Sequence, residues 1–198
     1  MPNQPTRVAI FLSETFSNIV LACLLEPLRV ARDNHQVDIQ WSFLTYDDQP
    51  VTSSSGMRIA PDTLLSERGH CDLAIVVGGD VFREEAGSDK VLRGIRALRE
   101  IDVIIGADTG AWLMARCGFL NGRSATLHWQ LLEEFAETFP EVKVSGDRFV
   151  RDGRYWTCGS AATALDLILH FIDASFGPAI AFDVSAMFLH EQARRMDT

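Results

Sequence analysis

The stretch that decides the fold is Val103-Ile104-Ile105-Gly106-Ala107-Asp108-Thr109-Gly110-Ala111-Trp112-Leu113-Met114-Ala115. An apolar run meets a turn of small residues, and a helical pattern begins at once. This order is typical of a strand, a sharp elbow and a helix, which together display one side chain at the corner. We expect Asp108 to be that residue. Many α/β enzymes hold a Ser or Cys nucleophile at such a corner, whereas residues 107–110 include neither.

Apolar runs and helical patterns alternate on both sides of this elbow. Strands are expected at residues 8–12, 39–46, 73–77 and 102–106. Helices are expected at residues 17–31, 88–99, 128–139 and 159–174, with a last one starting at Pro178. The run at residues 73–77 is apolar throughout, as in a central parallel strand. The alternation predicts an α/β fold, a three-layer sandwich with a mostly parallel, flavodoxin-like sheet.

Two local signals refine this prediction. Pro27 lies inside the first helical pattern and should kink or restart that helix, because proline cannot donate a backbone hydrogen bond. Asp152-Gly153 separates two strand-like runs, at residues 148–150 and 155–157, and predicts a hairpin turn.

Composition limits the classes of function. The 198 residues carry 18 Lys+Arg and 27 Asp+Glu, a net charge of -9, so we expect the chain to bind nucleic acid poorly by itself. A hydrophobic fraction of 47% suits one well-buried domain. No Cys and His spacing suggests a metal site, and we expect neither a metal nor a cofactor.

The compartment follows from the cysteines and the N-terminus. The four cysteines are far apart and lie in apolar or helical settings, as expected of free thiols in a reducing compartment. Residues 1–7 contain no apolar signal core, and no apolar run reaches the length of a membrane span. We therefore expect a cytoplasmic protein without a membrane partner.

Three strand ends should converge on one cleft, because ligands of parallel sheets bind beyond the carboxyl ends of the strands. These ends are Ser13-Glu14, Gly79-Asp80 and Asp108-Thr109. Gly78-Gly79 either forms an anion hole with the N–H groups of Thr109 or Gly110, or is a plain tight turn. Asp108 itself could be a base, a ligand-binding carboxylate or the N-cap of the following helix.

Three other residues leave alternatives open. His128, beside Trp129, could form a charged pair with Asp108, or could simply cap or pack at the start of its helix. Cys158 precedes a helix, the setting in which a thiol can become reactive, but it also reads as a core residue. Glu26 could point into the cleft or extend to solvent.

Four motifs resemble the ThiJ/PfpI superfamily, which is class I glutamine amidotransferase-like. They are residues 76–79, the elbow at residues 106–111, residues 117–129 and residues 157–166. The resemblance covers nearly the whole chain, and residues 118–129 are its most specific part. It is strongest to the branch that forms the N-terminal sensor domain of AraC-type transcriptional regulators.

This resemblance implies further expectations. In the superfamily's enzymes a Cys nucleophile stands at the position of Asp108, and a His follows about where His128 stands. AraC-type regulators are homodimers that continue into two helix-turn-helix units. We therefore expect a sensing domain at residues 1–190, a linker at residues 191–198, and DNA binding only through a domain that this chain lacks. The chain would then be a fragment of a longer protein.

The leading hypothesis is the ligand-sensing and dimerisation domain of such a regulator, catalytically inactive and binding a small nitrogenous metabolite such as an amino acid or a betaine. The expected ligand-binding residues are Asp108, Thr109, His128, Gly79, Asp80, Glu14 and Trp129. The alternative is a hydrolase or lyase of the same superfamily that uses Asp108 or Cys158 with His128. A third hypothesis is a dimerisation scaffold that binds no ligand.

Overall fold

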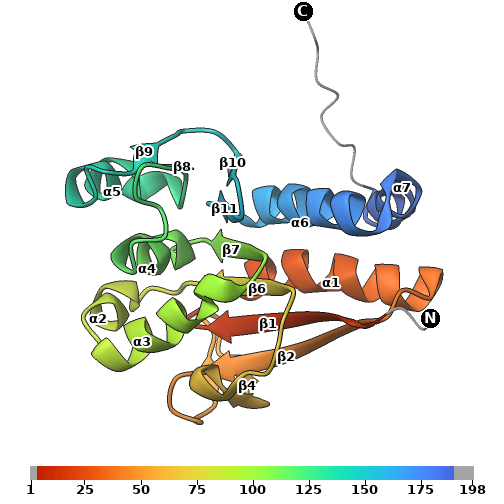
Figure 1. Ribbon diagram of the computed structural model, residues 1–198, viewed down its shortest axis with the longest axis horizontal. Coiled ribbons are helices and arrows are strands. Elements are labelled where there is room, and N and C mark those ends of the chain that lie inside the picture. The colour runs from red at the N-terminus through yellow and green to blue at the C-terminus, as the bar shows by residue number, and fades with distance from the viewer. Residues whose placement is uncertain (1–3, 190–198) are drawn as a thin grey trace, which may run out of the picture.

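Three layers make up the molecule, and the computed structural model describes residues 4–189 of it (Figure 1). The helices are α1 (Asn18–His35), α2 (Phe82–Ala86), α3 (Asp89–Ala97), α4 (Gly110–Arg116), α5 (Leu132–Thr138), α6 (Ala161–Phe176) and α7 (Pro178–Met187), with 3₁₀ turns η1 (Leu65–Glu67), η2 (Leu98–Glu100) and η3 (Trp129–Leu131). The strands are β1 (Thr6–Leu12), β2 (Ile39–Thr45), β3 (Val51–Thr52), β4 (Arg58–Ile59), β5 (Thr63–Leu64), β6 (Leu73–Val77), β7 (Val103–Ala107), β8 (Ser124–Ala125), β9 (Lys143–Val144), β10 (Phe149–Asp152) and β11 (Tyr155–Cys158).

The central sheet has seven strands in the order β10-β11-β7-β6-β1-β2-β5. All neighbours pair in parallel except the β10–β11 hairpin, which turns at Asp152-Gly153 as expected. Because β1, β6 and β7 are adjacent, their carboxyl ends lie side by side. The α/β, three-layer, mostly parallel architecture is confirmed.

Both faces of the central strands are buried, because alternate side chains enter different halves of the core. Ile10, Ile75 and Ile105 pack on one face with α1, α6 and α7. Phe11 and Val76 pack on the other face with α2, α3 and α4. The expectation of a central, fully apolar strand at residues 73–77 is correct, since every residue of β6 is buried.

Two expectations for α1 were settled by packing. The helix runs without interruption from Asn18 to His35 with Pro27 inside it, so the predicted restart is wrong. Pro27 is buried, and helix α1 packs along α6. These packing contacts offset the backbone hydrogen bond that Pro27 cannot donate. Glu26 extends to solvent, where its carboxylate accepts a hydrogen bond from Arg29 at 2.8 Å.

Short elements account for most of the remaining differences from the sequence pattern. Strands β3 and β5 and helix α2 were not expected, because two to five residues are too few to display a period. The helix expected from His128 begins instead as the 3₁₀ turn η3 and becomes α-helical at Leu132. Strand β9 does not join the main sheet but pairs with β8. Within residues 4–189, no helix is both long and apolar enough to cross a membrane.

Candidate functional site

The elbow is as sharp as the sequence suggests. Strand β7 ends at Ala107, helix α4 begins at Gly110, and Asp108 between them has a φ of 57°. This left-handed conformation is uncommon for residues with a Cβ, and Asp is one of the few that tolerate it. The backbone N–H of Asp108 donates to the carbonyl of Cys158 at 2.9 Å, which fixes the corner to the end of β11.

Asp108 is not the N-cap of the helix that follows. Thr109 occupies that position, and its side chain makes no capping hydrogen bond. The hydroxyl of Thr109 instead donates to the carbonyl of Gly79 at 2.9 Å and is buried there. This bond ties the elbow to the end of β6, and it leaves the Asp108 carboxylate for other partners.

Gly78 and Gly79 are glycines because backbone from two neighbouring strand ends lies against them. A Cβ on Gly78 would stand 2.2 Å from Thr109 Oγ1, and one on Gly79 would stand 2.1 Å from the carbonyl oxygen of Glu14. The N–H of Gly78 donates to the carbonyl of Ala107 at 3.1 Å, so it is not available to an anion. The geometry therefore favours the tight-turn interpretation of Gly78.

Asp108 has an unusual electrostatic environment for a carboxyl group. Burial raises its pKa above the ordinary value, and the charge of Asp80 adds to that increase. A positive charge on His128 and a hydrogen bond from the N–H of Thr109 act in the opposite direction. His128 and Asp80, two other residues expected at the site, are thus near enough for their charges to act on the Asp108 carboxyl group.

The end of β11 places His128. The N–H of Thr126 donates to the hydroxyl of Thr157 at 2.9 Å, and Gly159 leaves room for the backbone of residues 127 and 128. The His128 ring stacks on Trp129, with ring centroids 6.2 Å apart. Trp129 is 70% exposed, so it forms an open apolar rim beside the half-buried imidazole.

Glu14 binds strand β3 through its side chain and touches Gly79 through its backbone. Its carboxylate accepts a hydrogen bond from the N–H of Thr52 at 3.0 Å. The neighbouring hydroxyl of Thr15 accepts from the N–H of Asp80 at 2.8 Å and so positions the loop that carries Asp80. Glu14 therefore belongs to the edge of the site and Thr15, which the sequence did not single out, to its framework.

A buried acid beneath the strand ends also escaped the sequence analysis. Glu85 on α2 is 5% exposed and accepts a hydrogen bond from the Ser13 hydroxyl at 2.5 Å, while its Oε1 has no partner among the described residues. Burial raises the pKa of Glu85 to about 7 despite the bond from Ser13. The only signal was a charged residue on the apolar side of a very short helix.

The thiol beside this corner is not available as a nucleophile. Cys158 is completely buried, and burial followed by the charge of Asp108 raises its pKa, so the thiol stays protonated. No group of three metal-ligating side chains occurs within residues 4–189. The corner instead offers a carboxylate, an imidazole and an exposed indole.

The left-handed corner gives a first testable expectation. Asp108→Gly should raise the free energy of unfolding by about 1 kcal/mol, because glycine adopts a positive φ without strain and no carboxyl group is then buried. For a domain of this size, the thermal midpoint should rise by about 3 °C. Asp108→Ala is the matched comparison, since alanine keeps the strain; equal midpoints for the two variants would contradict this account of the corner.

The fold and the corner together define a flavodoxin-like α/β protein with a strand–elbow–helix site. The profile of the DJ-1/PfpI family matches residues 6–174, and the chain belongs to that family. The crystal structure of an AraC family transcriptional regulator from Pseudomonas putida superposes with a TM-score of 0.77 at 23% identity, covering 93% of this chain and 100% of that one.

Curated relatives include both regulators and an enzyme. The HTH-type transcriptional regulator CdhR of Pseudomonas aeruginosa is 35% identical over 176 residues, 88% of this chain and 52% of CdhR. The isonitrile hydratase of Pseudomonas putida is 29% identical over 133 residues, 67% of this chain and 58% of the hydratase. The chain thus spans little more than half the length of these two relatives.

Proposed function

We propose that this chain is the ligand-sensing and dimerisation domain of a cytoplasmic AraC-type transcriptional regulator, that it is catalytically inactive, and that it binds a small nitrogenous metabolite at the elbow. The observation that carries the proposal is the Asp108 carboxylate, held at the strained corner beside His128 and Asp80. Strain of this kind is characteristic of functional positions.

The charge of the corner supports a cationic ligand group. Asp108 and Asp80 make the electrostatic potential at the elbow more negative. A positively charged nitrogen placed between them would relieve their repulsion. Trp129 offers an aromatic face to the same cation. Gly79 and Thr109 would lie beneath the ligand at the elbow, and Glu14 would add a negative charge at the edge of the same site.

Catalytic inactivity is supported by what the elbow holds. A carboxylate stands where the superfamily's enzymes carry a Cys, and Cys158, the nearest thiol along the sheet, is sealed in the core. The alternative of a hydrolase or lyase using Asp108 and His128 has one relative in its favour, the isonitrile hydratase.

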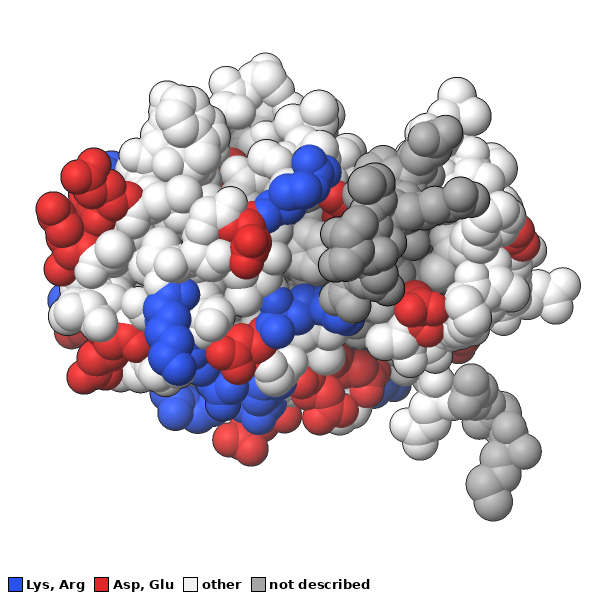
Figure 2. Space-filling model, turned by 90° about the horizontal axis from the view of Figure 1, so that it is seen from above, with Lys and Arg blue, Asp and Glu red and all other residues white. Residues whose placement is uncertain are grey.

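The proposal places DNA binding outside this chain. Relatives such as CdhR and GbdR are named HTH-type transcriptional regulators, and the expected linker at residues 191–198 lies outside the described residues. A homodimer is supported by helix α7, where Phe182 is 71% and Met187 is 63% exposed. Seen from above, charged side chains gather toward the left and lower edges, whereas the surface at the right, where α7 lies, is mostly uncharged (Figure 2).

The test is ligand binding by wild type and by Asp108→Asn. A thermal-shift screen of amino acids, betaines and other small amines should give a hit, whose dissociation constant is then measured by calorimetry. The substitution removes only the charge and keeps a residue that tolerates the left-handed corner. The dissociation constant should rise about tenfold or more, since a charged hydrogen bond contributes about 1.5–3 kcal/mol.

Asp102→Asn is the matched control, because it removes the same charge from an exposed position just before β7. Its dissociation constant should stay within about twofold of wild type. No hit among these compounds, or equal affinities for wild type and Asp108→Asn, would refute the proposal. Turnover of an isonitrile that His128→Ala abolishes would establish the enzyme instead.

A further inference from the structure

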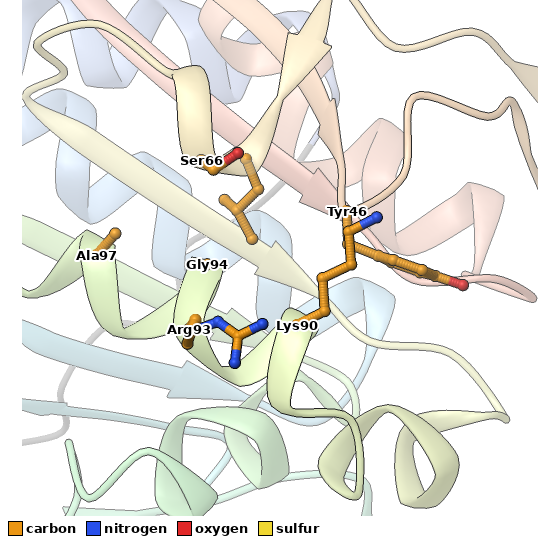
Figure 3. A pocket seen from close by; sticks show the side chains of 7 residues that line it. Tyr46, Ser66, Lys90, Arg93, Gly94 and Ala97 are labelled. Carbon is orange, nitrogen blue, oxygen red and sulfur yellow. The ribbon is translucent and has the colours of Figure 1, made fainter.

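A hollow lies away from the elbow, between helix α3 and the turn η1 (Figure 3). Its volume is about 380 Å³, within the range of small-molecule sites. Figure 3 shows Ser66 on one side and Arg93 on the other, with Ala97 and Tyr46 toward the two ends. In the sheet, β1 and β6 separate strand β2, which leads into Tyr46, from the elbow strand β7.

The charged side chains that line this hollow are both cationic. Lys90 and Arg93 are three residues apart on α3 and therefore share one face of the helix. Neither has an ion-pair partner among residues 4–189, whereas five other arginines pair with carboxylates. In a chain with a net charge of -9, two unpaired cations at one hollow attract an anion.

The other walls determine what kind of anion fits. Leu65 and Gly94 form an apolar wall, where a Cβ on Gly94 would stand 2.6 Å from Leu65 Cδ2. The Ser66 hydroxyl supplies a further donor opposite Arg93 (Figure 3). A planar guanidinium matches the two oxygens of a carboxylate, and the apolar wall matches a hydrocarbon body.

We propose that this hollow binds small organic carboxylates, as a second ligand site distinct from the elbow. The two sites differ in charge: the elbow carries the carboxyl groups of Asp108 and Asp80, whereas Lys90 and Arg93 line the hollow. A cationic metabolite and an organic anion would therefore not compete for the same place. This inference does not depend on what binds beside Asp108.

The test is a titration of the 198-residue chain with sodium benzoate, followed by amide chemical shifts. Benzoate should shift the amides of α3 and η1, leave those of residues 106–111 unchanged, and bind with a dissociation constant on the order of 1 mM. Benzamide, which has the same ring without the charge, should bind at least tenfold more weakly. Arg93→Gln should raise the dissociation constant for benzoate about tenfold, and Ala97→Phe should block binding by filling the hollow.

Arg96→Gln is the matched control, since Arg96 is exposed on the same helix but does not line the hollow. It should leave the dissociation constant within twofold of wild type. The proposal is overturned if benzoate does not shift the amides of α3 and η1, if benzamide binds equally well, or if Arg93→Gln and Arg96→Gln have the same effect. Because these positions are exposed, the polar variants should fold like wild type, and the amide spectrum verifies it directly.

Discussion

Gly78→Ala is expected to destabilise the folded chain severely. The added Cβ would stand 2.2 Å from Thr109 Oγ1, 2.3 Å from the backbone nitrogen of Gly110 and 2.4 Å from the carbonyl carbon of Thr109. Two of these atoms belong to backbone, so no rotamer change can make room. We expect a loss of about 4 kcal/mol or more in the free energy of unfolding, a large part of the roughly 5–15 kcal/mol that stabilises a typical domain.

Chemical denaturation followed by circular dichroism measures this loss. Gly69→Ala is the matched control, because a Cβ at Gly69 meets nothing within 4 Å and the residue is exposed. It should unfold at the same denaturant concentration as wild type, within experimental error. A Gly78→Ala variant as stable as Gly69→Ala would mean that the elbow and the end of β6 are not packed as described.

Glu85→Gln should stabilise the protein above neutral pH and remove part of its pH dependence. Burial raises the pKa of Glu85 from 4.5 in the unfolded chain to about 7. Between these values the folded state binds more protons than the unfolded state, so the contribution of Glu85 to stability falls as the pH rises from about 4.5 to about 7. The full decrease is about 3 kcal/mol, and glutamine, which does not ionise, lacks it.

The measurement is the free energy of unfolding of wild type and Glu85→Gln at intervals from pH 4.5 to pH 8. At pH 8 the variant should be about 3 kcal/mol more stable than wild type, whereas near pH 4.5 the two should be similar. Glu100→Gln, which alters an exposed acid, should follow the wild-type curve. Parallel curves for wild type and Glu85→Gln would show that folding does not raise the pKa of Glu85.

The elbow could be predicted from the sequence because all of its signals are local. An apolar strand, small residues and a helical period follow one another within residues 103–115, and the same kind of local pattern predicted β1 and β6. Parallel pairing then required the three strand ends to converge. A charged pair of Asp108 and His128 was one of two open interpretations of the sequence, and it stays a prediction: the charge of His128 acts on Asp108, but no ion pair or hydrogen bond joins the two side chains among residues 4–189.

The contacts that decide what the side chains do were beyond prediction. Thr109 reaches Gly79 across 30 residues, Glu14 reaches Thr52 across 38, and Ser13 reaches Glu85 across 72. No periodic pattern encodes such partners, because each depends on how two loops meet after the sheet has formed. The hollow beside α3 was missed for the same reason, since η1 and α3 carry no shared motif.

The close packing of Gly78, Gly79 and Gly110 has a consequence for how a bound ligand could be reported. The backbone atoms around these three glycines are in contact with one another, so there is no free volume into which this part of the site could move. Any displacement on binding must therefore occur at the rim, where Trp129 stands in solvent and leads into η3 and α5. In the proposed sensor, the rigid backbone at the glycines would select the ligand, and movement of Trp129, η3 and α5 would transmit its binding.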